Sequence, residues 1–164
     1  MDITLKPWQL RWAQDAGKKR TELNEGKVTD RPDYADHSVL QDDLTANTAA
    51  CICELAVSLC LNQSWNGAYW LPSEHREASK APDVGHNVEV RRVRHLGRPM
   101  PVKKSEQDCD IFQVWSNPND LSQVKIIGWA PGVYAWQHGE QLWQEKRALS
   151  VDRLWNFSAY ERSD

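Results

Sequence analysis

Two carboxylates and a cation are concentrated in the stretch PDVGHNVEVRR, residues 82–92. Asp83 precedes a glycine turn, and Glu89 and Arg91 follow in a segment that alternates like a β-strand. Because side chains alternate along a strand, Glu89 and Arg91 face the same side. Two carboxylates and a main-chain carbonyl suffice for Mg²⁺, which takes oxygen ligands and keeps several waters. A metal ion there can polarise a phosphodiester and lower the pKa of an attacking water.

The same residues also have a purely structural explanation. The DVG turn would join an amphipathic strand, and Arg91 would pair with Glu89 or Asp83. An acidic residue two positions before a basic one is common in proteins, so this stretch alone favours the structural explanation.

Glu54 is the only charged residue between Leu44 and Trp65, in the run CICELAVSLCL at residues 51–61. Carboxylates are seldom buried without a partner, because removing the charge from water is costly. Glu54 therefore either reaches solvent, pairs with an arginine, or lies beside a site that needs a negative group.

The segment around Glu54 predicts a helix over residues 45–62, with Thr45 or Asn47 as its cap. One apolar stripe of this helix comprises Ala49, Ile52, Ala56 and Leu59. The helical neighbours of Glu54 itself are also apolar, so we expect the helix to be central in the fold.

The remaining elements complete an α+β domain in which helices precede strands. We expect a helix over residues 7–25, a surface connection over 27–43 and a loop with one short strand over 63–82. The period then changes to two, and the predicted strands are residues 87–94, 98–104, 110–116 and 122–130. The simplest arrangement is an antiparallel meander, followed by a short helix or strand in each of the last two segments. We divide the single domain of residues 1–164 into residues 1–44, 45–130 and 131–164.

Composition and charge narrow the class of protein. The 164 residues carry a net charge of −3, which argues against a protein that coats nucleic acid. Six Arg or Lys residues and His95 nevertheless lie between Val90 and Ser105 without an acid. This basic stripe can direct a polyanion to one face, or it can be a solvated strand edge guarded by cations.

Location and packing are also constrained by the sequence. The chain shows no secretory signal and no apolar stretch of membrane-spanning length, so we expect a cytoplasmic protein that contacts no membrane. The four cysteines are expected to be free thiols, because their spacing suits neither a disulfide nor a zinc site. We expect most of the nine tryptophans to be buried or half-buried by packing.

Five segments together resemble the PD-(D/E)XK nuclease-like superfamily, most closely its small phage-encoded members. These segments are ELAVSLCL, WNG, APDVGHNVEVR, the basic strand and IIGW, and they span roughly residues 45–130. The resemblance implies a restriction-endonuclease-like core, with a central mixed or antiparallel sheet of about four strands flanked by helices. It also implies Mg²⁺- or Mn²⁺-dependent hydrolysis of DNA, in the host cell cytoplasm if a phage encodes the protein.

The resemblance assigns roles to the residues of the site. Asp83, Glu89 and the carbonyl of Val90 would bind the metal, and Glu54 would orient the metal or its waters. Arg91 departs from the family, which usually has lysine at this position. Arginine can hold a phosphate or stabilise negative charge, but it cannot act as a general base. A migrated amine would have to come from Lys103 or Lys104.

The DNA backbone would be contacted by the basic stripe, with little base readout. Its predicted contact residues are Arg92, Arg94, His95, Arg98, Lys103 and Lys104. The DNA is expected to be duplex, single-stranded or branched, and the enzyme to be a monomer or a homodimer. The alternative is a catalytically degenerate nuclease fold that binds DNA or inhibits a host protein, which Arg91 and the acidic net charge favour.

Overall fold

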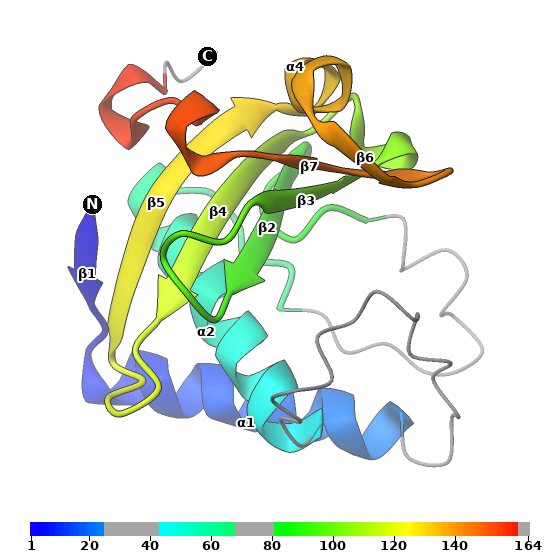
Figure 1. Ribbon diagram of the computed structural model, residues 1–164. Helices are drawn as coiled ribbons and strands as arrows, with labels where there is room; N and C mark the ends of the chain where they lie inside the picture. Colours follow the sequence, from blue (N-terminus) through cyan, green and yellow to red (C-terminus); the bar gives the residue numbers. More distant parts are fainter. Residues whose placement is uncertain (25–42, 68–80, 161–164) are drawn as a thin grey trace.

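The computed structural model describes residues 1–24, 43–67 and 81–160. Its centre is a mixed four-stranded sheet with the strand order β1-β5-β4-β2 (Figure 1). These strands are β1 Asp2–Thr4, β5 Gln123–Pro131, β4 Asp110–Ser116 and β2 Val88–Val93. The general prediction of an α+β domain with about four strands in its sheet is confirmed.

The predicted antiparallel meander is wrong. Strand β2 pairs with β4 in parallel, from Val88 opposite Asp110 to Val93 opposite Trp115. Parallel neighbours need a crossover of a dozen or more residues, and the segment between the two strands supplies it. That crossover contains β3 (Met100–Lys103), which leaves the main sheet, and the 3-10 helix η1 (Lys104–Glu106).

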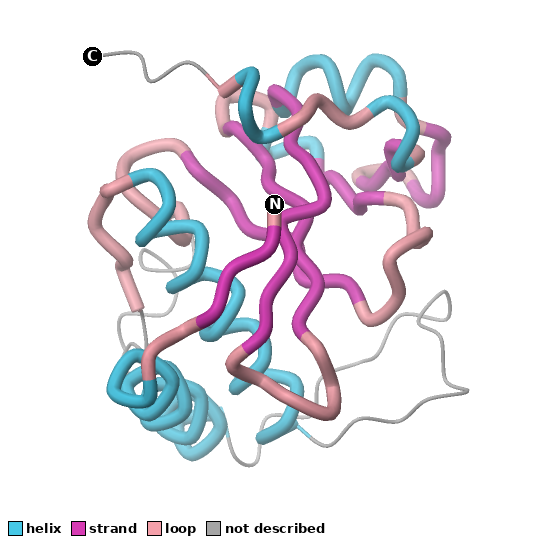
Figure 2. The backbone as a smooth tube through the Cα atoms, turned by 90° about the vertical axis from the view of Figure 1, so that its left-hand side faces the viewer, coloured by secondary structure: helices cyan, strands magenta, loops and turns pink. Residues whose placement is uncertain are grey.

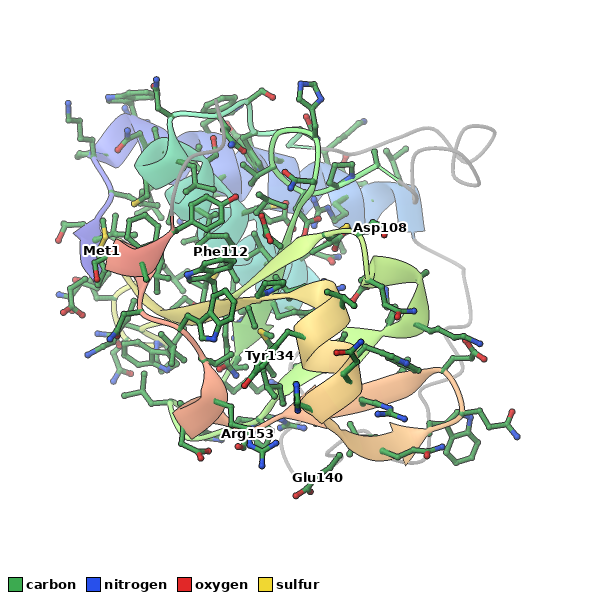
Figure 3. The ribbon with its side chains drawn as sticks, turned by 90° about the horizontal axis from the view of Figure 1, so that it is seen from above. Met1, Asp108, Phe112, Tyr134, Glu140 and Arg153 are labelled. Atoms are coloured by element: carbon green, nitrogen blue, oxygen red, sulfur yellow. The ribbon has the colours of Figure 1, made fainter. Side chains whose placement is uncertain are left out.

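Strand β3 belongs to a second sheet that the sequence did not predict, with the order β3-β7-β6. Its other strands are β6 Glu140–Trp143 and β7 Lys146–Leu149, and the helix α4 Gly132–His138 packs beside them. The short helix and strands expected after residue 130 are therefore present. Two further 3-10 helices follow, η2 Val151–Arg153 and η3 Phe157–Ala159. Phe112 of β4, labelled in Figure 3, contacts Phe157 of η3, with ring centroids 6.1 Å apart.

Two long helices lie on one side of the main sheet, with the second sheet toward the other side (Figure 2). They are α1 Pro7–Asn24 and α2 Asp43–Leu61, close to the two predicted ranges. Because α2 begins at Asp43, neither Thr45 nor Asn47 is its cap. Asn47 instead donates to the hydroxyl of Thr21 on α1, at 2.9 Å.

Helix α2 is the central helix of the fold, as predicted. It packs against β2, β4 and β5, and residues 51–58 are all buried. Leu59, placed in the apolar stripe by the sequence, is instead 41% exposed, although Ser58 and Leu61 of the same turn are buried.

Helix α2 is also the one described helix that is long and apolar enough to cross a membrane, over Leu44–Leu61. The expectation that no apolar stretch reaches this length is therefore wrong for α2. More than half of the stretch is buried inside the fold, which is the behaviour of a core helix in a soluble protein.

The cysteines are free thiols, as expected, and Cys51 and Cys53 are buried. The tryptophans meet the expectation only in part. Among the described ones, four are buried or half-buried, namely Trp129, Trp65, Trp115 and Trp136. The other four are between 40% and 58% exposed, namely Trp8, Trp12, Trp143 and Trp155.

Candidate functional site

A clamped turn positions Asp83. Trp65 and Val84 form an isolated antiparallel bridge, and Val84 pairs in turn with Val88 at the start of β2. The turn between them needs glycine, because Gly85 has φ +58° and an added Cβ would lie 2.3 Å from the side-chain oxygen of Gln63. The structure therefore places the PDVG turn at the exposed edge of the main sheet, beside β2.

Asn66, from the WNG motif, ties this turn to the preceding loop. Its side chain donates to the carbonyls of Pro82, at 2.6 Å, and Gly85, at 3.3 Å. Its backbone N–H donates to the carbonyl of Asp83 at 3.2 Å. The WNG and PDVG motifs thus form one structural unit.

The Asp83 carboxylate accepts a hydrogen bond from the backbone N–H of Val90 at 2.8 Å. Burial and the nearby charges of Glu54 and Glu89 raise the pKa of Asp83 to about 7, although the Val90 N–H opposes the shift. Glu54 comes from α2 on one face of the sheet, and Glu89 projects from the other face. Asp83 therefore lies beside β2, where the charges of both Glu54 and Glu89 act on it. We call Glu54, Asp83 and Glu89 the acidic cluster.

Glu54 is the buried carboxylate of α2, and its partner is Arg20 of α1. The guanidinium of Arg20 donates to both oxygens of Glu54, each at 3.0 Å, and the indole of Trp65 donates to Oε2 at 3.2 Å. This arginine pairing was one of the open alternatives for Glu54. Sequence reasoning did not find Arg20, which is 34 residues away, and no local signal indicates the pairing.

Arg91 is held between two carboxylates. It donates to Glu89 Oε2 at 3.2 Å and to the carbonyl of Val90 at 3.2 Å, and it pairs with Oε1 of Glu106. The side chains of Arg91 and Glu106 are only 16% and 7% exposed. The structure thus shows Glu89 and Arg91 on the same side of β2, as the alternation predicted.

Glu106 is a site residue that sequence reasoning missed. It ends η1, and its Oε2 accepts from the backbone N–H of Lys103 at 3.0 Å in a capping box. Asp108, labelled in Figure 3, marks the short connection that leads from η1 to β4.

The sequence signal that could have indicated Glu106 was its spacing from Lys103, because a glutamate at the third position after a helix cap is typical of a capping box. Glu106 also directly follows the acid-free basic stripe.

The two carboxylates beside Arg91 respond differently to their surroundings. Burial raises the pKa of Glu89, because the opposing charge of Arg91 does not compensate for the lost water. Burial also acts on Glu106, but Arg91 and the Lys103 N–H outweigh it and hold the pKa of Glu106 below its ordinary value. Arg91 is therefore bound more strongly by Glu106 than by Glu89.

The fit of a metal ion depends on which oxygens are already engaged. Within the described residues, no group of three or more His, Cys, Asp or Glu side chains has the geometry of a metal site. Asp83 and Glu89 each use one oxygen in a hydrogen bond and keep the other outside the bonds described above. The carbonyl of Val90 accepts from Arg91. Each carboxylate therefore keeps one oxygen, the kind of ligand that hard cations take, whereas the carbonyl of Val90 is shared with Arg91.

The predicted basic stripe does not form one surface. Arg92 is half-buried on the face of β2 that packs against α2, where burial lowers its pKa and Cys53 lies nearby. Lys103 extends to Glu106, with 3.3 Å between Nζ and Oε1, and its charge opposes the rise in the pKa of Glu89. Lys104 pairs with exposed Glu145 at 3.7 Å. Of the two predicted amines, Lys103 is the one at the site.

The other members of the basic stripe lie where β2 ends. Arg94 is half-buried, and its carbonyl accepts from the Trp115 indole at 3.1 Å. His95 and Arg98 are exposed in the following turn.

Comparison of the chain with protein-family models, with curated proteins and with solved structures gives no match.

Proposed function

We propose that this protein is a nuclease of the PD-(D/E)XK type, which hydrolyses a phosphodiester of DNA with Mg²⁺ or Mn²⁺ held by Asp83 and Glu89. The observations that carry the proposal are that Asp83 accepts from the N–H of Val90, next to Glu89 on β2, and that the charges of Glu54 and Glu89 both act on it. Burial and mutual repulsion raise the pKa of Asp83 to about 7. A divalent cation would relieve this repulsion, since an opposite charge favours the ionised form of a carboxylate.

The fold supports the proposal at a coarse level. The resemblance implies a restriction-endonuclease-like core with a mixed sheet flanked by helices. A mixed four-stranded sheet beside α2, with the PDVG turn and β2 at its edge, is compatible with that core.

Each side chain of the site has a distinct part in the proposed reaction. The ion, when bound, supplies Lewis-acid polarisation and activates a water. Arg91 holds a phosphate oxygen through the N–H groups that now contact Glu89 and Glu106, and it cannot take the proton. Lys103 is the nearby amine, and Arg20 with Trp65 fixes the orientation of Glu54. Exposed His95 and Arg98 would contact the backbone of the DNA.

A cleavage assay with Glu89→Gln tests the proposal. The wild type is expected to cut duplex, single-stranded or branched DNA in Mg²⁺ or Mn²⁺, and Glu89→Gln to lose at least about 100-fold in rate, because a metal ligand is lost. Glu145→Gln is the matched control, since Glu145 is exposed and its ion-pair partner is the exposed Lys104. Absence of cleavage by the wild type on every substrate, or equal rates for Glu89→Gln, would contradict the proposal.

The second candidate is a non-catalytic module of the same fold that binds DNA or a host protein. It is favoured by Arg91, which already donates to Glu89 and to the Val90 carbonyl, two of the proposed metal ligands. Arg91→Lys separates the candidates. A rise in cleavage supports the nuclease, because lysine can give up a proton, whereas an inactive variant with intact fold and binding supports the module.

A further inference from the structure

The first half of α1 exposes two large aromatic side chains. Trp8 is 52% exposed and Trp12 is 49% exposed, and they are one helical turn apart, which is about 6 Å along the axis. Such exposure of two neighbouring tryptophans is unusual, because indoles are highly buried on average. The two rings therefore form an accessible aromatic surface on the outside of the fold.

Cations flank these two rings. Lys6 and Arg11 are both exposed, and no acidic residue lies between Leu5 and Gln14. Asp15, three residues after Trp12, is the first acidic residue of α1. In a chain whose net charge is −3, this segment is a local positive region. We call Lys6, Trp8, Arg11 and Trp12 the α1 platform.

The α1 platform is connected to the carboxylates of the candidate site through one side chain, that of Trp65. The rings of Trp12 and Trp65 make an edge contact, with centroids 4.9 Å apart and planes at 76°. The Trp65 indole then donates to Glu54 at 3.2 Å. The backbone of Trp65 also pairs with Val84, the residue after Asp83. One side chain, Trp65, therefore separates the platform from the acidic cluster.

We infer that the α1 platform binds single-stranded DNA and leads it to the acidic cluster. Aromatic side chains stack on unpaired bases without regard to sequence, and nearby cations hold the backbone phosphates. Both features are present in the platform. Bases within a duplex are already stacked on one another, so their faces are not available to Trp8. The inference rests on the proposed function, and it adds the strand preference and the path of the substrate.

Binding without cleavage tests this inference. Fluorescence anisotropy would measure the Kd of a labelled thymidine oligonucleotide of about 15 nucleotides, and of a duplex of equal length, in EDTA. We expect the single strand to bind more tightly than the duplex. Trp8→Ala should weaken single-strand binding by roughly 5- to 100-fold, because stacking on one base is lost. Trp8 is half-exposed, so the variant should fold, as circular dichroism would verify.

Two further variants serve as controls for this experiment. Trp143→Ala removes an exposed tryptophan from β6, far from α1 in Figure 1, and should change the Kd by less than about twofold. Arg11→Gln should reduce the dependence of binding on salt by about one phosphate contact. Equal weakening by Trp8→Ala and Trp143→Ala would overturn the inference.

Other outcomes would overturn it as well. Tighter binding of the duplex than of the single strand would do so. A second such outcome is a protein that does not bind the single strand but associates with itself, with the association abolished by Trp8→Ala. The proposed function is judged separately by cleavage of the same strand in Mg²⁺, which Asp83→Asn should abolish. Strand binding through Trp8 without cleavage in Mg²⁺ would refute the nuclease and keep the platform. Cleavage at equal rates by the wild type and Trp8→Ala would support the nuclease and refute the platform.

Discussion

Arg91 is the residue whose surroundings most constrain the chemistry of the site. Its guanidinium lies between Glu89 and Glu106 and also contacts the Val90 carbonyl. A buried ion pair adds little net stability, because desolvation offsets the attraction. Its consequence here is geometric, since the two carboxylates fix the direction of the guanidinium beside Asp83. A phosphate that enters the site must compete with Glu89 and Glu106 for the same N–H groups.

Removing the charge of Glu106 tests how firmly Arg91 is held. Glu106→Gln should lower the free energy of unfolding by about 1–3 kcal/mol, because it weakens a charged hydrogen bond at a buried position. Glu145→Gln, which breaks the exposed pair with Lys104, should change it by less than about 0.5 kcal/mol. Urea denaturation of both variants gives the comparison. Equal changes would mean that Glu106 contributes no more than a surface pair.

The raised pKa of Asp83 makes stability depend on pH. Its folded-state pKa is about 7 against an ordinary value of 3.8, so the folded state keeps a proton that the unfolded state has lost. The contribution of Asp83 to stability therefore falls as pH rises from about 4 to about 7, and is constant above that range.

Asp83→Asn removes this titration. The free energy of unfolding of the variant, relative to that of the wild type, should increase between about pH 4 and about pH 7, because only the wild type loses stability as Asp83 ionises. Denaturation at several pH values without divalent cations measures the difference. A difference that does not change with pH would show that the carboxyl of Asp83 titrates normally.

At the scale of elements, helix α1 reaches the site because Gly17 allows it to approach α2 closely. A Cβ on residue 17 would lie 2.5 Å from the Cα and 2.7 Å from the backbone nitrogen of Thr48. Arg20 follows one turn later on the same helix and pairs with Glu54. The closeness of the two helices thus determines whether the guanidinium can reach the buried carboxylate.

Gly17→Ala sets two effects of opposite sign against each other. Helix propensity alone would stabilise the variant by about 1 kcal/mol, whereas overpacking against Thr48 costs about 1–3 kcal/mol. We expect net destabilisation, because the clashing atoms belong to the backbone of α2 and cannot rotate away. Gly97→Ala is the control, since no atom lies within 4 Å of its added Cβ. Thermal denaturation that shows Gly17→Ala to be more stable than the wild type would contradict this packing.

The elements could be predicted from the sequence because each has a local pattern. The apolar run around Glu54 defined α2, and the alternation of residues 87–94 defined β2. Pairing between elements has no such local signal. Strand β3 was predicted beside β2, but its partner is β7, more than forty residues later. The prediction of an antiparallel meander was wrong for that reason, although each of the predicted strands exists.

The candidate site was predictable to the same extent. Asp83, Glu89 and Arg91 lie close together in sequence, so the turn and strand geometry brought them together in the prediction. Arg20 and Glu106 come from other elements, and their pairing with Glu54 and Arg91 depends on how α1 and η1 pack. Both missing residues are charged partners of predicted ones, which long-range packing alone reveals.

At the scale of the whole molecule, a negative net charge is combined with local groups of exposed cations. Among the described residues, exposed Lys6 and Arg11 flank the tryptophans of α1, and exposed His95 and Arg98 follow the end of β2. A polyanion can therefore be guided along α1 and the end of β2 while the remaining surface repels it. This arrangement is a property of the folded chain, since the basic stripe in the sequence is split between several surfaces.

The central claim is that Asp83 and Glu89 hold a divalent cation. Calorimetric titration of Mg²⁺ or Mn²⁺ into the wild type, Asp83→Asn and the exposed control Asp120→Asn tests it most directly. We predict binding to the wild type and to Asp120→Asn, with release of a proton near pH 6 because Asp83 must ionise, and no binding to Asp83→Asn. Equal binding to all three proteins, or no binding to the wild type even with single-stranded DNA present, would contradict the claim.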